Sequence, residues 1–547
     1  MRRQGVKGPR NAIVHACEPY DFLPLCLRLL SGAIREDPER PGDISAAEDW
    51  HPPADLKDAQ RQHHILQLAY GTMAKDRRDL LSRIAAMRGP VDYAAVKVLS
   101  TYENEEELKE ALRELVARGL LFRRQGRARY DLHPIVRQYA YDRLGDKAVT
   151  HKALKDYFDT VPKPDKIGSL DDLLPTIELF HHTILAGGYK EAFRVYRDRL
   201  AAPLYYQLGA YDTRISLAQA FFPDGEDQPP HLEDESDQAW ILNSLAAAYH
   251  TTGQSRKTVG LLKRQNAIQE KVGRKDNLAG GLGNLAISQI SLGKLKGAES
   301  NLRRRIEIGK EITEERVEAI GHQELGRLLG YMGRYDQAHK ELETAVALFA
   351  RQNDEQSQCI VWSYRGLRAI LVNEPKSALK ALQEARAAAE KWRLKRARPE
   401  PNQRDLVYIL WLSGAAKRLG GDTPGAEADL SEALSRCRRI RLVELEADIL
   451  LETAKLQWQK AEGKNAERTE QAASLTREAL EIADRCEYRL KQADIHNFLA
   501  EMALAEGNKA TALKHAGIAK ERAWCDGPPY CYRKALDQAE QMLAKLQ

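Results

Sequence analysis

The apolar positions between His231 and Glu374 recur at helical spacing, and no proline interrupts this stretch. The stretch is too long to be one helix, so several helices must be joined by other residues. The joints recur every 40 residues at Gly253, Gly293, Gly333 and Asn373. Asparagine commonly replaces glycine where the backbone φ is positive, so each step predicts a helical corner. The series continues more loosely at Gly421, Gly463 and Gly507.

Small residues occupy two further positions at a fixed distance from these corners. The position five residues after the corner holds Ala298, Ala338, Ala378, Ala426 and Ala512. The position seven residues before it holds Ala246, Ala286, Gly326, Gly366, Gly414 and Ala500. One small residue on each helix of a hairpin allows two antiparallel helices to approach closely. The period therefore predicts an α-solenoid of helical hairpins.

This pattern resembles the tetratricopeptide repeat (TPR) family over residues 231–547. The best segment, from His322 to Ala345, matches the family at Leu325, Gly326, Gly333, Tyr335 and Ala338. The period of 40 residues exceeds that of the standard repeat, which implies helices about one turn longer. Generic helical hairpins without TPR geometry are the alternative. An earlier hairpin is expected at Gly187 and Ala192, and a helix after Pro528-Pro529 is expected to cap the array.

Residues 76–145 follow another pattern, in which three helices precede two short alternating runs. The helices are expected in "DRRDLLSRIAAM", "YAAVKVL" and "EEELKEALRELVARG". The runs "LLFRR" and "RYDLH" flank Gln125-Gly126, which is a hairpin signal, and a last helix begins at Pro134. This order predicts a winged helix.

The chain is therefore expected to be all-α, with a small helical segment and winged helix followed by a TPR-like α-solenoid. The expected divisions are a helical segment at 1–72, the winged helix at 73–150, a connector or atypical first hairpins at 151–230, and the superhelix at 231–547. In the first segment two helices are expected to meet near Phe22-Leu23-Pro24-Leu25.

Composition narrows the class of protein. The 84 basic and 79 acidic residues nearly cancel over 547 positions, which argues against a dedicated nucleic-acid or polybasic membrane protein. The seven cysteines are irregularly spaced and include no C-x-x-C pair, as expected for reduced thiols without a zinc site. The apolar stretch from Phe22 to Ile34 is interrupted by Arg28 and is too short to span a bilayer. We expect a soluble cytoplasmic protein without a metal or a membrane partner.

The order of the segments resembles the C-terminal part of bacterial STAND NTPases (signal-transduction ATPases with numerous domains). The matching parts are "FLPLCLRLL", a winged helix ending in "DLHPIVRQYA", and the helical array. The resemblance implies that Pro24 packs against the adenine end of a nucleotide. It also implies that His133 contacts the β-phosphate of ADP, although Pro134 stands where the family motif has aspartate. The alternatives are a helix kink at Pro24 and a helix cap at His133.

The residues that would bind and hydrolyse ATP are absent from this sequence. It contains no G-x-x-x-x-G-K motif followed by Ser or Thr, and no apolar strand ending in paired acids for magnesium. We therefore expect no catalytic residues and no enzyme activity from this chain alone. ATP or ADP and Mg²⁺ are expected only together with an upstream nucleotide-binding core. The pairs His63-His64 and His181-His182 lack an HExxH context, and "GQS" at Gly253 to Ser255 is a repeat corner.

A DNA-binding role for the winged helix is weighed against its charges. The wing is basic, with Arg123, Arg124, Arg127 and Arg129, and could contact phosphates. The helix that would enter the major groove carries Glu105, Glu106, Glu107, Glu110 and Glu114 against Lys109, Arg113 and Arg118. Phosphates repel such a helix, so an intramolecular role is favoured over nucleic-acid binding.

The first helix of each repeat is expected to line a concave groove that binds a protein. Counting back from the corners, the groove-facing residues are Asn243, His250, Gln323, Arg327, Tyr331, Tyr408, Trp411 and Arg418. The main hypothesis is the sensor and regulatory region of a STAND-type ATPase, for example in antiviral defence. In it the array binds a protein trigger, with or without ligand-induced oligomerisation, and the winged helix relays the signal to a nucleotide-binding core in cis or trans. The alternatives are a stand-alone TPR scaffold and a winged-helix transcription regulator with a TPR effector domain.

Overall fold

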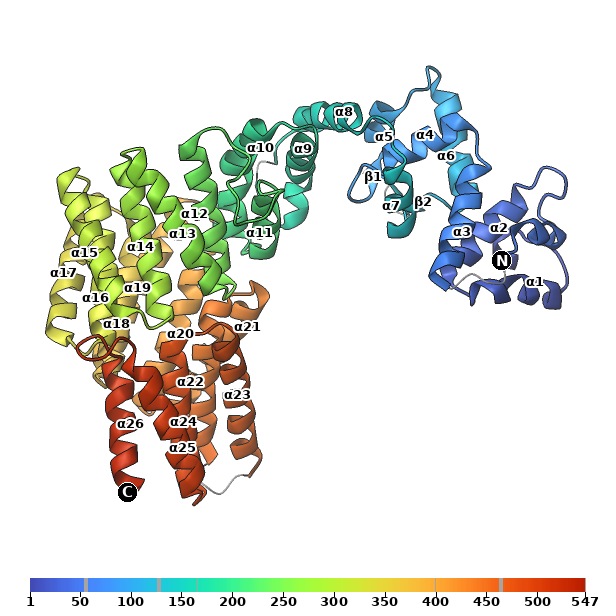
Figure 1. Ribbon diagram of the computed structural model, residues 1–547. Coiled ribbons are helices and arrows are strands. Elements are labelled where there is room, and N and C mark those ends of the chain that lie inside the picture. Colours follow the sequence, from blue (N-terminus) through green and yellow to red (C-terminus); the bar gives the residue numbers. More distant parts are fainter. Residues whose placement is uncertain (54–57, 125–128, 165, 399, 462–465, 547) are drawn as a thin grey trace. The chain divides into compact units, whose positions relative to one another are not determined.

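The computed structural model describes residues 1–53, 58–124, 129–164, 166–398, 400–461 and 466–546 (Figure 1). The chain divides into two compact units. The first comprises Met1–Lys166 with Asp171–Val195, and the second comprises Ile167–Leu170 with Tyr196–Gln547. The division between them therefore falls inside the segment expected to be a connector, residues 151–230.

The first unit begins with three helices: α1 (Arg10–Cys17), α2 (Pro24–Arg35) and α3 (Asp58–Gly71). The chain turns between α1 and α2, where Asp21 and Phe22 have positive φ values of 47° and 55°. Pro24 occupies the first turn of α2, where its missing N–H costs nothing, so it starts a helix and does not kink one.

The winged helix follows in the predicted order. Its elements are α4 (Lys75–Ile84), β1 (Val91–Asp92), α5 (Tyr93–Leu99), α6 (Glu105–Ala117), β2 (Phe122–Arg124), β3 (Arg129–Asp131) and α7 (Pro134–Asp142). The three strands form an antiparallel sheet in the order β1-β3-β2. Asn104 caps α6 by accepting a hydrogen bond from the Glu106 amide at 2.9 Å, and the apolar face of α6 is buried. The expected turn at Gln125-Gly126 lies outside the described residues.

Three helices complete the first unit: α8 (Lys147–Thr160), α9 (Leu174–Leu185) and α10 (Tyr189–Val195). The expected corner between α9 and α10 is present at Gly187, which has a φ of 83°.

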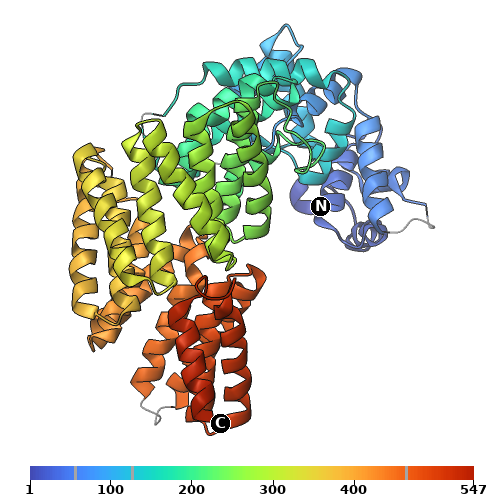
Figure 2. The same ribbon diagram turned by 60° about the vertical axis from the view of Figure 1, so that its left-hand side comes forward.

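The second unit begins with two π-helical turns (Tyr196–Leu200 and Pro203–Gln207) and α11 (Tyr211–Gln219). A succession of helical hairpins follows (Figure 2). The first four hairpins are α12 (Glu235–Thr251) with α13 (Ser255–Lys271), α14 (Lys275–Ser291) with α15 (Leu295–Glu311), α16 (Glu315–Tyr331) with α17 (Tyr335–Gln352), and α18 (Glu355–Leu371) with α19 (Pro375–Lys395). The next three are α20 (Gln403–Leu419) with α21 (Thr423–Arg439), α22 (Val443–Ala461) with α23 (Ala466–Arg485), and α24 (Arg489–Ala505) with α25 (Lys509–Trp524). The expected capping helix is α26 (Arg533–Leu546).

The periodic residues have the structural roles that their spacing predicts. The corner residues have φ values between 59° and 84° at Gly253, Gly293, Gly333, Asn373, Gly421 and Gly507. Gly463 lies outside the described residues. At the crossing position, a Cβ on Gly326 would lie 2.6 Å from Leu342 Cγ, and one on Gly414 would lie 2.6 Å from Leu430 Cγ. The expectation of an all-α chain with a winged helix and a TPR-like solenoid is confirmed.

The array also packs against itself across long sequence separations. Helix α12 contacts α22, and α14 contacts α24. A Cβ on Gly253 would lie 2.5 Å from Cys486 Sγ, one on Gly293 would lie 2.5 Å from Arg489 Cδ, and one on Gly333 would lie 2.6 Å from Arg533 Cβ. The corner glycines therefore have two roles. They make tight turns, and their lack of a side chain leaves room for atoms of the later repeats. As a result, first helices of early and late hairpins surround a common interior in place of a fully open groove.

None of the described helices is both long enough and apolar enough to cross a lipid bilayer.

Candidate ligand-binding site

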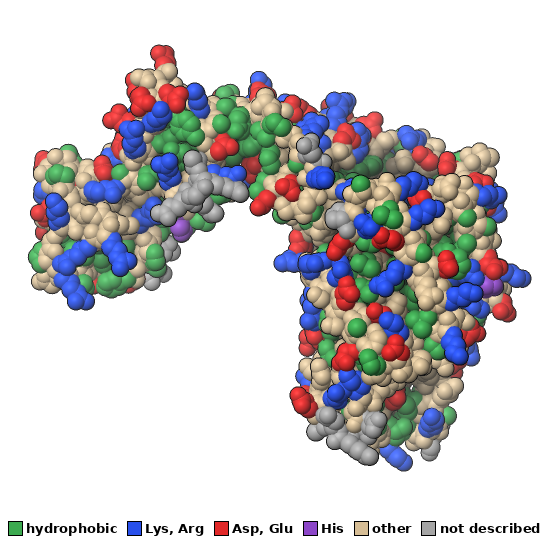
Figure 3. Space-filling view, turned by 180° about the vertical axis from the view of Figure 1, so that it is seen from behind, with side chains coloured by type: hydrophobic (Ala, Val, Ile, Leu, Met, Phe, Trp, Pro, Cys, Tyr) green, Lys and Arg blue, Asp and Glu red, His purple; other side chains and the backbone are tan. Residues whose placement is uncertain are grey.

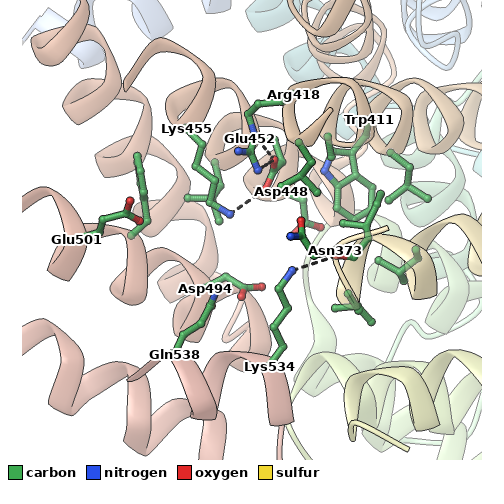
Figure 4. Close-up of a pocket in the computed structure, with 18 of the residues that line it drawn as sticks. Asn373, Trp411, Arg418, Asp448, Glu452, Lys455, Asp494, Glu501, Lys534 and Gln538 are labelled. Carbon is green, nitrogen blue, oxygen red and sulfur yellow. Dashed lines mark hydrogen bonds and ion pairs between the residues drawn. The ribbon is translucent and has the colours of Figure 1, made fainter. Parts of the chain in front are cut away.

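The interior of the second unit contains a cavity of about 470 Å³, which we term the chamber (Figure 4). Side chains from α16, α18, α20, α22, α24 and the start of α26 line it. Gln459, Glu501 and Gln538 are exposed lining residues and mark its mouth. A volume of this size is typical of small-ligand sites in proteins.

Equivalent positions of successive hairpins supply the inward-facing side chains. Tyr408, Asp448 and Asp494 are each the sixth residue of their helices, α20, α22 and α24. One helical turn further along, Leu412, Glu452 and Phe498 occupy the tenth position, and all three line the chamber. The repeat therefore builds one chamber from short segments of many helices.

One wall of the chamber carries a closed cluster of charges. Arg418 Nη2 and Lys455 Nζ each lie 2.8 Å from a carboxylate oxygen of Glu452 (Figure 4). Burial opposes ionisation of Glu452, but these two cations hold its pKa far below the usual range. Lys491 donates to the Asp448 carboxylate, and burial still raises the pKa of Asp448. These five charged groups therefore compensate one another in two sets, one around Glu452 and one between Lys491 and Asp448.

Two other charged groups of the chamber are arranged differently. Asp494 Oδ2 accepts a hydrogen bond from the Tyr532 hydroxyl at 3.0 Å, and Lys534 Nζ donates to the Ile370 carbonyl at 3.4 Å. Within the described part of the chain, neither Asp494 nor Lys534 forms an ion pair. Burial raises the pKa of Asp494 to about 6, although Lys455 and Lys534 oppose that shift. Burial likewise lowers the pKa of Lys534, which Asp494 opposes.

Aromatic rings supply much of the remaining lining. The rings of Tyr331 and Tyr532 meet edge to face at 5.5 Å, and those of Trp458 and Phe498 meet at 6.4 Å. Trp411 packs edge to face against Tyr408 at 5.2 Å. The buried Trp411 Nε1 has no hydrogen-bond partner among the described residues. The chamber thus combines apolar ring surface with one carboxylate, one ammonium group and one donor.

The structure brings five of the eight sequence-predicted groove residues to this interior. Tyr331, Trp411 and Arg418 line the chamber, and Arg327 and Tyr408 line a smaller adjoining cavity of about 60 Å³. Their burial is greater than an open groove would give, with Tyr408 and Trp411 each 8% exposed. Arg327 pairs with Glu324 at 2.7 Å and lies over the Tyr364 ring, so its charge is already paired, although its buried Nε has no hydrogen-bond partner among the described residues.

The other three predicted groove residues lie outside the chamber. Asn243 accepts a hydrogen bond from Asn284 at 2.8 Å, and Gln323 donates to Glu324 at 2.9 Å. His250 Nε2 lies 3.5 Å from Glu444, which connects α12 to α22. Burial opposes ionisation of Glu444, but Arg404 and His250 hold its pKa well below the usual range.

Sequence reasoning missed Asp448, Glu452, Asp494 and Lys534. Adding the period of 40 to Tyr408 and to Leu412 gives Asp448 and Glu452, so a signal for both was present. Asp494 lies 46 residues after Asp448, which places it out of step with the period. Lys534 lies in the capping helix, where the repeat pattern ends.

The two residues assigned to a nucleotide by resemblance lie in the first unit, on separate elements. His133 caps α7, and its Nδ1 accepts a hydrogen bond from the Ile135 amide at 3.3 Å. In the neutral ring this leaves the proton on Nε2, which is the donor that a phosphate oxygen would need. Pro24 is exposed at the start of α2. The cap is therefore observed at His133, and it is compatible with a phosphate contact through the other nitrogen.

The winged helix is held by the segment that precedes it. A Cβ on Gly32 of α2 would lie 2.3 Å from the Arg118 carbonyl at the end of α6. Arg35 donates to the Ala117 carbonyl, and the Arg28 guanidinium lies 3.6 Å from the centre of the Phe122 ring. Helix α2 therefore packs directly on the C-terminal end of α6.

The surface of α6 keeps the charges that its sequence indicates. Glu105 pairs with Lys97 at 3.1 Å and Glu106 pairs with Lys109 at 2.8 Å, while Glu107 and Glu110 are exposed. Arg123 is exposed beside it, whereas the Arg124 side chain and Arg127 lie outside the described parts. Over the face of the molecule in Figure 3, basic and acidic side chains are interspersed.

Comparison with known proteins places the winged helix in a family of domains. A family described as "Winged helix-turn-helix domain" matches residues 73–145. Proteins of Mycobacterium bovis and Mycobacterium tuberculosis, both named as HTH-type transcriptional regulators, are 29% identical over 147 residues. That match covers 26% of this chain and 15% of each relative, so the chain spans a small part of their length.

Two solved structures resemble larger parts of the chain. A STAND protein with a tetratricopeptide repeat sensor from Pyrococcus horikoshii has a TM-score of 0.43 and 16% identity, over 98% of this chain and 75% of that one. A Rap protein complexed with competence and sporulation factor has a TM-score of 0.42 and 17% identity, over 63% of this chain and 93% of that one.

Proposed function

We propose that this chain is the sensor and regulatory region of a STAND-type signalling ATPase. In this proposal the TPR-like array binds a polypeptide trigger, and the winged helix relays that binding to a nucleotide-binding core in cis or trans. The observation that carries the proposal is the chamber, because among the described residues its Asp494 carboxylate and Lys534 ammonium group form no ion pair and lie beside aromatic rings. Groups of this kind are costly to bury unless a ligand compensates them.

The contacts of α6 support an intramolecular role for the winged helix. Its exposed face carries Glu106, Glu107 and Glu110, and DNA phosphates would repel each of them. Its C-terminal end is packed on α2 at Gly32, so movement of α6 is mechanically linked to the segment that resembles the region after a STAND core.

A buried chain of aromatic side chains supports relay within the first unit. The Tyr141 hydroxyl lies 2.8 Å from His151 Nε2, and His151 Nδ1 lies 2.9 Å from His182 Nδ1. These contacts join α7 to α8 and α9. Since His133 caps α7, we expect a change at that cap to reach the helices that follow the winged helix through these contacts.

ADP, when bound to such a core, would supply the phosphate charge that holds the resting state. His133 is the residue of this chain that would meet it, by donating from Nε2 while Nδ1 stays on the Ile135 amide. Pro24 would offer an exposed ring to the adenine end.

The proposal is tested by fluorescence anisotropy of this chain with duplex DNA and with a fluorescent ADP analogue. We expect no sequence-specific DNA affinity and no ADP affinity from the chain alone. Tight ADP binding by this chain would contradict the assignment of the nucleotide site to a separate core.

A second candidate function is DNA-binding transcription regulation. It is favoured by the matched relatives, which are named as HTH-type transcriptional regulators, and by the exposed Arg123 of the wing. In this case anisotropy would report salt-dependent binding of duplex DNA, weakened by Arg123→Ala and strengthened by Glu106→Gln.

A further inference from the structure

The unpaired charges of the chamber indicate the chemistry of its ligand. Of the charged residues that line it, Arg418 and Lys455 are compensated by Glu452, and Asp448 is compensated by Lys491. Glu501 is exposed at the mouth. Asp494 and Lys534 are left as one negative and one positive group inside.

The hydrogen-bond partner of each of these two groups is neutral, although the two charges also attract each other through space. Asp494 accepts from the Tyr532 hydroxyl, and Lys534 donates to the Ile370 carbonyl. A carboxylate has about four acceptor positions and an ammonium group has three donors, so both retain capacity for a charged ligand. Charge-assisted hydrogen bonds of this kind are about twice as strong as neutral ones.

The two groups stand on different elements, which gives the ligand a direction. Asp494 lies on α24 with Lys455 of α22 nearby, and Lys534 lies on α26 and reaches toward the end of α18 near Asn373 (Figure 4). The rings of Tyr331, Trp411 and Phe498 line the same chamber. A complementary ligand therefore has an ammonium group, a carboxylate and apolar side chains.

We propose that the chamber binds a short zwitterionic peptide or a free amino acid, with its ammonium group at Asp494 and its carboxylate at Lys534. The two sources share this chemistry, and the cavity of about 470 Å³ admits either. Apolar side chains of the ligand pack against the aromatic lining. This inference rests on the proposed sensor role, and it replaces a polypeptide trigger of any length by a short peptide or an amino acid whose two termini are free.

The test is isothermal titration calorimetry of the full chain with leucine, dileucine and trileucine. Each compound is also used in an N-acetylated form, which removes the ammonium group, and in a C-amidated form, which removes the carboxylate. We expect the best unblocked compound to bind and each blocking group to weaken it at least about tenfold. Preference for leucine identifies a free amino acid, and preference for trileucine identifies a peptide.

Two variants connect this result to the residues. Asp494→Asn should weaken the unblocked compound about tenfold and abolish the further effect of acetylation. Lys534→Met should do the same for amidation. The control is Glu470→Gln, which removes a charge from a side chain that is 75% exposed on α23 and should leave affinity unchanged. Melting curves check that each variant is folded. If a variant is unfolded, the affinities of the blocked compounds for the parent chain still test whether the two termini are recognised.

The proposal is overturned if none of the compounds binds at up to about 10 mM, or if blocking either terminus leaves affinity within about twofold. Neither result bears on the winged helix, so the sensor assignment would then depend on the His133 test described below. Conversely, if the chain bound both a zwitterion and a specific DNA sequence, the ligand proposed for the chamber would be supported and the STAND assignment would be refuted.

Discussion

The crossing of the two helices in the third hairpin leaves no room for a side chain at Gly326. A Cβ there would lie 2.6 Å from Leu342 Cγ, 2.8 Å from Leu342 Cδ2 and 3.2 Å from the Ala338 carbonyl. Real Cβ contacts are essentially never that short, and the carbonyl belongs to the facing backbone. Leu342 is fully buried, so the added methyl group must displace packed atoms of the core.

Two effects of opposite sign decide the result of Gly326→Ala. Alanine gains about 1 kcal/mol of helix propensity over glycine, whereas overpacking of a dense core costs roughly 1–3 kcal/mol. We expect the packing cost to win and the free energy of unfolding to fall by up to ~2 kcal/mol. The larger Gly326→Leu should destabilise at least as much.

The measurement is chemical denaturation of the chain followed by circular dichroism, with Gly260→Ala as a matched control. Gly260 is an exposed residue inside α13, and a Cβ there would meet no atom within 4 Å. Gly260→Ala should therefore stabilise by about 0.5–1 kcal/mol, with the opposite sign. Combining Gly326→Ala with Leu342→Ala should cost less than the sum of the two, because the second change makes room for the first. Stabilisation by Gly326→Ala, or strict additivity with Leu342→Ala, would refute the close crossing.

Three further results are expected. Burial lowers the pKa of His151 to about 4 and that of His181 to about 3, so both side chains are neutral in the folded state at pH 7. Their contribution to stability is complete above the unfolded pKa of about 6.5 and is lost as the pH falls toward 4. Thermal melts across this pH range should therefore show a smaller loss of stability for His151→Phe than for the parent. Gly32→Ala should loosen α2 from α6, since its Cβ would lie 2.3 Å from the Arg118 carbonyl, and hydrogen exchange should rise at the end of α6 while the repeat array is unchanged. The isolated chain should show neither ATP hydrolysis nor ADP affinity, and a micromolar dissociation constant for ADP in calorimetry would contradict this.

The sequence predicts those features that depend on residues close together in the chain. The corners at Gly253 and Gly293, and the small residues of each hairpin, follow from one repeat and need no knowledge of the whole array. The winged helix likewise follows from helical and alternating patterns, although β1 contains only two residues and leaves no pattern to detect.

The chamber could not be predicted in the same way. It forms because the corner at Gly253 meets Cys486 and the corner at Gly333 meets Arg533, and such contacts between residues some 200 positions apart leave no periodic signal. The same closure explains why Tyr408 and Trp411, expected in an open groove, are largely buried. Asp494 falls outside the period because α22 and α23, with 19 and 20 residues, are longer than the 17-residue helices α20 and α21 of the preceding hairpin.

The most direct test of the STAND assignment is nucleotide hydrolysis, without trigger, by a protein that joins this chain to its nucleotide-binding core. His133→Ala removes both the cap of α7 and the phosphate donor, whereas His133→Asn keeps a good helix cap and removes the imidazole. If His133 holds ADP in the resting state, both variants should raise trigger-free activity, and the asparagine variant of the isolated chain should melt like the parent. If the His133→Asn protein has the same trigger-free activity and the same stability as the parent, and only His133→Ala differs, then His133 is a structural cap only. That result would contradict the central claim.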